Sequence, residues 1–465
     1  MIPESLQTLV ATHQQQHLLR FWDRLSSAEQ SVLTREIEAV DFAQLGQLLA
    51  KAQAAVDWNE IAARATSPDA FRLGAVPATE LAAARAAGEA ALKAGQVAVV
   101  LVAGGQGTRL GFDHPKGMYS LGPVSGHSLF QILLEKVLAV SRRYQQPVPL
   151  VVMTSPATHE ETAGYLREHD WFGLPADDVR MCCQGTMPAV DMQSGQILLA
   201  EPGRLALSPD GHGGLVAAMA SSGTLDELQR RGISLLFYMQ VDNPLATVCD
   251  PVFLGHHLRT GSQMSTQVVA KRDPLDRVGN FARYAGKARI IEYSDLPDEA
   301  AKRRHVDGSL VFWAGNIAVH AFDIAFLKEM AGSADGLPFH RAEKKVPYVD
   351  ASGHTVDPDQ PNAYKFERFI FDLLPAANRA IAVEVDEAEC FAPVKNEPGA
   401  AKDTPESAQR MMVDLHTAWL QTAGVEVLPG VAVEISPLLA LDAEELAQKV
   451  TARATISSPK YLREG

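Results

Sequence analysis

An apolar hexapeptide followed by a glycine-rich turn constrains this chain more than any other feature. Residues 97–102 read VAVVLV, a run that is too short to span a membrane and is typical of a central strand in a parallel sheet. The following residues, AGGQGTRLG, are therefore expected at the carboxyl edge of that sheet. Gly104, Gly105 and Gly107 permit close backbone approaches that a Cβ would block, so their N–H groups can face a phosphate or a base.

Two cations follow this turn. Arg109 adds a fixed positive charge and Lys116 a mobile one, and together with the glycine N–H groups they predict a polyphosphate nucleotide as the ligand. The spacing Gly105-x-Gly107-x-x-x-Gly111 misses the dinucleotide fingerprint by one residue, and no Gly-Lys-Ser/Thr follows, as a P-loop would require. Both common nucleotide-binding motifs are therefore disfavoured, and a nicotinamide dehydrogenase is disfavoured with them.

The pattern along the chain predicts an α/β protein. Apolar residues recur at helical spacing over residues 1–95, which indicates a helical N-terminal lobe. Strands and helices alternate over 96–388, which predicts a doubly wound, Rossmann-like mixed sheet, and 389–465 are expected to form a small C-terminal domain. The expected strands are Val97–Val102, Leu150–Thr154, Leu235–Val241, Thr266–Ala270, Leu310–Phe312 and Ile381–Val385, and the expected helices include Leu129–Tyr144, Thr224–Arg231 and Ser407–Ala423.

Charge and cysteine usage limit the partners and the compartment. A net charge of −14 opposes a nucleic-acid partner, which would need a broad basic face, although Arg109, Lys116, Lys365 and Lys395 can still form one local positive pocket. Two of the four cysteines are adjacent, so no disulfide framework is implied and a cytoplasmic location is expected. No run reaches about 18 apolar residues and no basic leader precedes an apolar core, so we expect neither a membrane partner nor secretion by that route.

Asp242 is a candidate metal ligand. It follows the apolar strand expected at 235–241 and precedes Asn243-Pro244, which places its carboxylate at the carboxyl edge of the sheet, where ligands of open α/β sheets collect. Mg²⁺ is commonly held by one or two carboxylates together with substrate phosphates, so Asp242 is predicted to bind Mg²⁺ or Mn²⁺. A strand-ending Asx turn is the alternative interpretation.

The string GGQGTRLG followed by PKGMY resembles the eukaryotic-type UDP-N-acetylhexosamine pyrophosphorylases, a family of UTP:sugar-1-phosphate uridylyltransferases. Further blocks resemble that family in the family's order and extend the resemblance over roughly residues 90–450. They are QGTMPAV (184–190), SPDGHGGL (208–215), VDNPL (241–245), VGN (278–280), IEYSDL (291–296), AGNIAVH (314–320), KKVPYVD (344–350), KFERFIFDLL (365–374), FAPVKN (391–396) and EISPLLA (434–440).

The resemblance implies a nucleotidyltransferase reaction. N-Acetylglucosamine 1-phosphate would attack the α-phosphorus of UTP in line, giving UDP-N-acetylglucosamine and pyrophosphate, in a monomer or weak homo-oligomer. Such a transfer needs alignment and charge neutralisation more than a protein nucleophile. By the same resemblance, Lys116 and Arg109 act at the departing phosphates, Lys395 contacts the phosphate being joined, and Lys365 touches the nucleotide phosphates.

The family's base and ribose contacts match Gln184, Gly211 and the backbone of Ala103, Gly104 and Gly105. A side-chain amide both donates and accepts, which complements the imide N–H and flanking carbonyls of uracil. An exposed loop glutamine is the alternative for Gln184.

For the sugar, Gly279, Glu292 and Asn316 match positions that bind hydroxyls and the N-acetyl group, although a strand residue such as Glu292 can equally face solvent. His212 departs from the family pattern, because the amino-sugar enzymes usually carry asparagine there and glucose-specific relatives carry histidine. A glucose-1-phosphate uridylyltransferase and a broad-range UDP-sugar pyrophosphorylase therefore stay as alternatives. A UDP-sugar-binding protein without catalysis is a further alternative, and it predicts a gap at Lys116 or Asp242, where both residues are present.

Overall fold

The computed structural model describes residues 1–50, 57–333 and 336–464, and the chain divides into two compact units. The smaller unit comprises Met1–Asp57, Gln184–Gly214 and Asp335–Ile370, and the larger unit comprises Trp58–Cys183, Leu215–Ala334 and Phe371–Gly465. The boundaries expected at 95/96 and 388/389 do not coincide with this division. Segments far apart in the sequence build the smaller unit, and no break in composition marks where they join.

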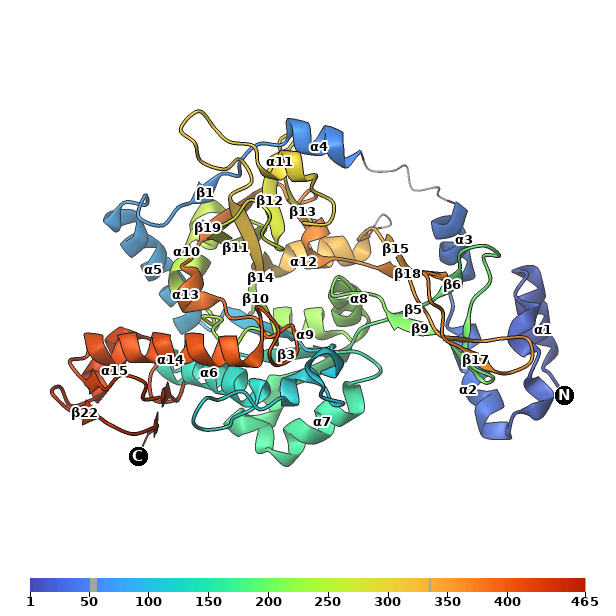
Figure 1. Cartoon of the computed structure of the whole chain (residues 1–465), viewed down its shortest axis with the longest axis horizontal. Helices are drawn as coiled ribbons and strands as arrows, with labels where there is room; N and C mark the ends of the chain where they lie inside the picture. Colours follow the sequence, from blue (N-terminus) through green and yellow to red (C-terminus); the bar gives the residue numbers. More distant parts are fainter. Residues whose placement is uncertain (51–56, 334–335, 465) are drawn as a thin grey trace. The chain divides into compact units, whose positions relative to one another are not determined.

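A mixed sheet of ten strands dominates the larger unit (Figure 1). Its strands are β1 (Ala70–Phe71), β2 (Val97–Val102), β3 (Leu150–Thr154), β4 (Val179–Cys183), β10 (Leu235–Gln240), β11 (Met264–Ala270), β12 (Gly279–Tyr284), β13 (Lys287–Ile291), β14 (Ala314–Asp323) and β19 (Ala380–Glu384). The main path runs β1-β19-β11-β14-β10-β2-β3-β4, and the hairpin β12–β13 pairs with β14. β2 is parallel to β3 and β10, whereas β14 is antiparallel to β10 and β11. The predicted α/β fold with a mixed sheet is confirmed.

Burial explains why β2 forms where its sequence predicts. Every residue from Val97 to Leu101 is at most 1% exposed. Val97, Val99 and Leu101 belong to the main core of the larger unit, and the alternate residues Ala98 and Val100 are buried on the other face. A strand covered on both faces needs a continuous apolar run, which is what this segment provides.

Several helices of the larger unit begin at a side chain that caps the first turn. The helices of this unit include α4 (Trp58–Arg64), α5 (Ala78–Lys93), α6 (Leu129–Tyr144), α7 (His159–Glu168), α9 (Thr224–Arg230), α10 (Pro251–Thr260), α11 (Asp298–Ala301), α12 (Ile324–Gly332), α13 (Glu387–Cys390), α14 (Pro405–Thr422) and α15 (Ala443–Lys449), with 3₁₀ turns η3 (Thr108–Leu110), η4 (Lys116–Met118), η5 (Asp170–Gly173) and η6 (Ala176–Asp178). Ser128 caps α6 by accepting the Gln131 N–H at 3.1 Å. Ten of the sixteen residues of α6 are buried, so this helix fills the core.

One expected strand is wrong. Leu310–Phe312 forms only an isolated bridge, between Leu310 and Arg304, and then a turn. All three residues are buried, and Val311 and Phe312 belong to a separate apolar cluster, so their hydrophobicity reflects packing rather than sheet pairing. The strand of this region is β14, which begins two residues later.

The C-terminal part of the larger unit adds short parallel pairs beside α14 and α15. These pairs are β20 (Glu426–Val427) with β22 (Thr455–Ile456), and β21 (Val433–Ile435) with β23 (Lys460–Leu462). Leu420 and Leu446 pack with Val433 and Ile435 in a small core of their own.

The smaller unit combines N-terminal helices with short antiparallel strands. Its helices are α1 (Glu4–Thr12), α2 (Ser27–Glu38) and α3 (Phe42–Ala50), with 3₁₀ turns η1 (Gln16–Leu19) and η2 (Trp22–Arg24). Its strands are β5 (Thr186–Pro188), β6 (Val190–Asp191), β7 (Leu199–Glu201), β8 (Arg204–Leu205), β9 (Leu207–Pro209), β15 (His340–Lys344), β16 (Tyr348–Val349), β17 (Thr355–Val356) and β18 (Ala363–Glu367). Leu33 and Ile37 of α2 pack with Val190 and Phe366 of the strands. Two further elements, α8 (Gly214–Ser221) and η7 (Ile370–Leu373), begin at the ends of this unit's segments.

Within the described residues, no helix has both the length and the apolar character needed to cross a bilayer.

Candidate functional site

The turn that follows β2 is tied to its neighbours and open on one side. Ala103 N–H donates to Met153 O at 2.7 Å, and the Ser155 hydroxyl donates to Gly104 O at 2.7 Å. A Cβ built on Gly105 meets no other atom within 4 Å. The turn therefore has a fixed backbone with room beside Gly105, as a ligand-binding turn requires.

The loop that follows the glycine turn folds back on it and so positions Arg109 and Lys116. Lys116 N–H donates to Gly105 O at 3.1 Å, which brings η4 back to the glycine turn. A Cβ on Gly107 would lie 2.7 Å from Phe112 O, so the closure accepts only glycine there. Lys116 and Arg109 consequently stand on two short turns anchored at the end of β2.

Asp242 lies at the same edge of the sheet. Val241 N–H donates to Val102 O at 3.0 Å, so β10 and β2 end level with each other. Asp242 is a buried polar residue, with 9% of its surface exposed. Val394 N–H donates to Asp242 O at 2.9 Å, which brings the segment leading to Lys395 to this edge as well.

Four charged side chains share one electrostatic environment here. The Lys116 ammonium donates to Val394 O at 3.3 Å. Burial lowers the pKa of Lys116, the Asp242 carboxylate raises it, and the positive charges of Lys395 and Arg109 lower it further. Three cations beside one carboxylate form a locally positive site in a chain of net negative charge, which favours a polyphosphate ligand.

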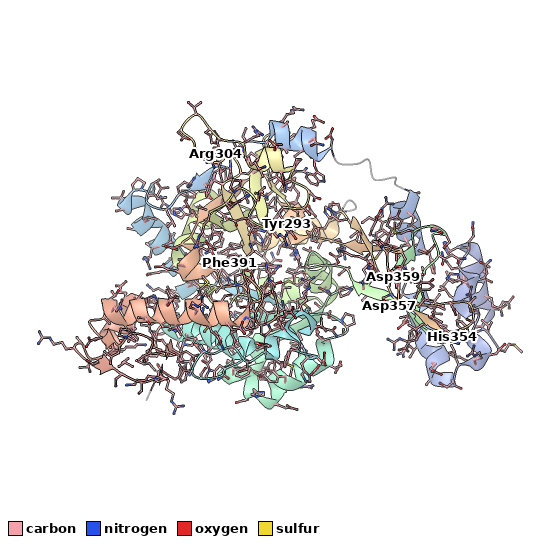
Figure 2. All side chains as sticks on the ribbon, viewed as in Figure 1. Tyr293, Arg304, His354, Asp357, Asp359 and Phe391 are labelled. Atoms are coloured by element: carbon pink, nitrogen blue, oxygen red, sulfur yellow. The ribbon has the colours of Figure 1, made fainter. Side chains whose placement is uncertain are left out.

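Lys395 extends from a stretch whose backbone is also fixed. Its N–H donates to Asp403 O at 2.7 Å, and its ammonium lies 5.9 Å from the centre of the Phe391 ring, which is labelled in Figure 2. Lys395 itself is exposed, so its ammonium can reach a ligand at this edge.

The donor set around Asp242 suits a metal that arrives with phosphate oxygens. Among the described residues, no group of three or more His, Cys, Asp or Glu side chains is arranged to hold a metal ion. Mg²⁺ is usually bound by one or two carboxylates while substrate phosphates and water complete its octahedron. Asp242 can supply the one carboxylate that such a metal needs, and the neighbouring cations would offset the remaining phosphate charge.

The predicted sugar residues form a second cluster in the larger unit. Gly279 and Asn316 are register partners of β12 and β14. A Cβ on Gly279 would lie 2.9 Å from Glu292 Oε1, so the carboxylate of Glu292 reaches this pair. Asn316 Oδ1 accepts the Ala318 N–H at 2.9 Å, which fixes the amide. Because β14 is antiparallel to β10, it begins at the edge where β10 ends, and the Asn316 cluster lies at the edge that carries Asp242.

The remaining predicted residues lie in the smaller unit, which is described on its own. Gln184 is 7% exposed, and its neighbour Gly185 accepts the Asp210 N–H through its carbonyl at 3.0 Å. Gly211 has φ +84°, and a Cβ there would lie 2.4 Å from Arg368 O, so this position requires glycine. The structure thus brings Gln184 together with the Gly211–His212 loop.

His212 and Lys365 are positioned by the same strand region. The Ile370 N–H donates to His212 Nδ1 at 3.2 Å. Burial lowers the pKa of His212 to about 4, so the imidazole is neutral at physiological pH and offers hydrogen bonds rather than charge. Lys365 is partly exposed on β18, opposite Ala342 of β15.

Sequence reasoning missed the ion pair that holds this loop. Asp210 and Arg368 are paired, with side-chain exposures of 3% and 19%. Arg368 also binds the loop through its backbone, because its N–H donates to Asp210 O at 2.7 Å and its O accepts the Gly213 N–H at 2.8 Å. The signal was present in SPDGHGG and KFER, where charged residues of opposite sign adjoin predicted site residues.

We expect Asp210→Asn to destabilise the fold strongly. The change leaves the Arg368 guanidinium without its carboxylate, and breaking a buried pair in this way costs about 3–5 kcal/mol. Urea unfolding measures the free energy of unfolding. The control is Asp69→Asn, whose partner is Arg283 and whose side chain is 79% exposed, with an expected loss below about 1 kcal/mol. Equal losses in the two variants would contradict the assigned importance of the Asp210–Arg368 pair.

Comparison with known proteins gives consistent matches over most of the chain. A family model described as UTP–glucose-1-phosphate uridylyltransferase matches residues 41–458. The chain is 39% identical over 365 residues to the UDP-N-acetylglucosamine pyrophosphorylase of Saccharomyces cerevisiae, covering 77% of this chain and 76% of the relative. It is 36% identical over 488 residues to UDP-N-acetylhexosamine pyrophosphorylase-like protein 1 of Xenopus tropicalis, covering 96% and 94%. The crystal structure of the Trypanosoma brucei UDP-N-acetylglucosamine pyrophosphorylase in complex with an inhibitor aligns with a TM-score of 0.82 at 30% identity, covering 95% of this chain and 93% of that chain.

Proposed function

The chain belongs to the UTP–glucose-1-phosphate uridylyltransferase family, and on this basis we propose that it makes UDP-N-acetylglucosamine and pyrophosphate from UTP and N-acetylglucosamine 1-phosphate. The observation that carries the proposal is that relatives 36–39% identical over most of the chain are named for N-acetylhexosamine products. The cluster of Lys116, Asp242 and Lys395 at the carboxyl edge of the sheet supports the same chemistry.

The reaction is a displacement at the α-phosphorus of UTP. An oxygen of the sugar phosphate attacks, the bond to the bridging oxygen of the β-phosphate breaks, and pyrophosphate leaves with the electron pair. Lys116 and Arg109 stabilise the charge that grows on the leaving group, and Lys395 orients the attacking phosphate. No covalent intermediate on the protein is required.

Mg²⁺ or Mn²⁺, when bound, would neutralise part of the phosphate charge, and Asp242 is the residue that would hold it.

Gln184 and Gly211 keep their proposed roles toward uracil and ribose, together with the backbone from Ala103 to Gly105. Lys365 keeps its proposed role toward the nucleotide phosphates. Gly279, Glu292 and Asn316 are proposed to bind the hexose and its N-acetyl group. We propose a cytoplasmic monomer or weak homo-oligomer, and a chain with only four cysteines, two of them adjacent, suits a reducing compartment.

Pyrophosphate release tests this function. Purified protein, UTP and Mg²⁺ are incubated separately with the 1-phosphates of N-acetylglucosamine, N-acetylgalactosamine and glucose. The highest kcat/KM is expected with N-acetylglucosamine 1-phosphate. A preference for glucose 1-phosphate would favour the second candidate, a glucose-specific or broad-range enzyme, which His212 supports. Binding of UDP-sugars without turnover of any sugar would indicate a protein without catalysis.

Replacing His212 by asparagine should change sugar preference. Asparagine keeps a hydrogen-bonding side chain but removes the ring that packs 5.5 Å from Phe369. We expect the ratio of kcat/KM for N-acetylglucosamine 1-phosphate over glucose 1-phosphate to rise about 10-fold, the scale of one altered pocket contact. The exposed His354, labelled in Figure 2, supplies the control, because His354→Asn should leave the ratio unchanged. The same ratio in His212→Asn and the parent would exclude His212 from sugar selection.

A further inference from the structure

Lys136 is a lysine on a helix that otherwise fills the core. It lies on α6 between Glu135 and Val137, both of which are buried. Its ammonium donates to Pro244 O at 2.7 Å and to Ala246 O at 3.0 Å. Burial lowers its pKa to about 8, so holding a charge here has a cost that an apolar residue would avoid. A charged residue kept at such a position calls for a role.

The two carbonyls that bind Lys136 belong to the segment that begins with Asp242. The far side of this segment is fixed by Asn243, whose amide N–H donates to Cys390 O at 2.8 Å and whose Oδ1 accepts the Ala392 N–H at 3.0 Å. Asn243 is 3% exposed, so these bonds are shielded from water. The chain from Asp242 to Ala246 is therefore held on one side by the 390–394 stretch and on the other by Lys136.

This arrangement connects α6 to the candidate catalytic cluster through a short path. Val394 N–H binds Asp242 O, and Val394 O accepts the Lys116 ammonium. A shift of the 242–246 segment would move the Asp242 carboxylate relative to Lys116. Both of these hydrogen bonds of Lys136 go to backbone carbonyls, so its ammonium holds the chain in place.

We propose that Lys136 is a positioning residue that fixes the Asp242 carboxylate for the metal–nucleotide complex by holding the carbonyls of Pro244 and Ala246. The proposal rests on the proposed role of Asp242 in metal binding. Groups that orient a metal ligand typically change metal affinity or activity by 10- to 100-fold when they are removed.

Direct metal binding tests the proposal without requiring turnover. Mn²⁺ is titrated into the full-length protein in the presence of UTP and without sugar phosphate, and free Mn²⁺ is followed by electron paramagnetic resonance. Lys136→Met is expected to raise the dissociation constant of Mn²⁺ about 10-fold and to lower kcat by a similar factor in the complete reaction. Lys136 lines a cavity of about 560 Å³, so a methionine side chain has space there and the variant is expected to fold.

Three further variants make the result specific. Lys449→Met removes a lysine that also donates to a backbone carbonyl, Leu439 O at 2.7 Å, and should leave the Mn²⁺ constant unchanged. Asp242→Asn removes the proposed ligand itself and should weaken Mn²⁺ binding at least as much as Lys136→Met. Lys136→Gln keeps an amide donor that can bind a carbonyl, and its Mn²⁺ constant should fall between those of the parent and Lys136→Met.

The outcomes distinguish the positioning role of Lys136 from the metal-binding role of Asp242. If Asp242→Asn weakens Mn²⁺ binding and the Lys136 variants bind as the parent does, the positioning role is overturned while the metal role of Asp242 stands. If Asp242→Asn leaves the Mn²⁺ constant unchanged, the metal role fails and the inference about Lys136 fails with it. If Lys136→Met does not fold, the Mn²⁺ constant of Lys136→Gln alone decides whether Lys136 has the positioning role.

Discussion

Replacing Lys116 by methionine should lower kcat on the order of 10²- to 10³-fold with N-acetylglucosamine 1-phosphate as substrate. Methionine keeps much of the side-chain volume and removes the ammonium that stabilises the departing pyrophosphate, and losing one such electrostatic contact has an effect of this size. Because the charge on the leaving group grows toward the transition state, kcat should fall more than the KM for UTP rises. Steady-state kinetics under saturating Mg²⁺ measures both parameters.

The matched control for Lys116→Met is Lys93→Met on α5. The Lys93 side chain is 61% exposed and pairs with Glu89, four residues earlier. Its substitution should leave kcat within about twofold of the parent, since exposed helical pairs contribute little. A Lys116→Met enzyme with the kcat of Lys93→Met would remove Lys116 from the chemistry.

The second large effect is expected for Asp242→Asn. The amide has the shape of the carboxylate but lacks its charge, so it should weaken metal binding and lower kcat about 10²-fold at parental Mg²⁺ concentrations. A second consequence follows from the cluster itself. The Asp242 charge raises the pKa of Lys116, so its removal shifts the Lys116 pKa further down and weakens the lysine's positive charge as pH increases. On the alkaline side of the pH profile, the activity of Asp242→Asn should therefore begin to fall at a lower pH than the activity of the parent.

Mg²⁺ titration of activity over a series of pH values measures both effects. The control is Asp226→Asn, because the Asp226 side chain is 67% exposed and pairs with Lys328 on the surface. Parental Mg²⁺ dependence in Asp242→Asn would show that the metal is held elsewhere.

Local sequence patterns predict the centre of the fold because they are tied to burial. The continuous apolar run of β2 and the amphipathic, Ser-capped α6 have the bounds that the sequence indicates. The same reasoning fails at Leu310–Phe312, where buried residues pack in a turn. Hydrophobicity alone does not separate a strand from any other buried segment.

The sequence predicts the parts of the candidate site whose residues lie in one short motif. It does not predict the parts that depend on contacts between residues far apart in the chain. The glycine turn, Arg109 and Lys116 are close in sequence, so their grouping follows from one loop. The Arg368 side chain meets Asp210 across 158 residues, and the bonds of Lys136 cross 108 and 110 residues. The motifs that contain Asp210 and Arg368 do not say that the two side chains meet, and nothing in the local composition around Lys136 distinguishes it from a surface cation. Only the folded chain reveals these pairings.

Phosphorus NMR of the complete reaction tests the central claim most directly. The protein is incubated with UTP, Mg²⁺ and N-acetylglucosamine 1-phosphate, and every phosphorus species is followed in the same sample. Uridylyl transfer predicts loss of the triphosphate and sugar phosphate signals and growth of UDP-N-acetylglucosamine and pyrophosphate in equal amounts. Unchanged signals, or conversion of UTP to UDP and inorganic phosphate, would contradict the account.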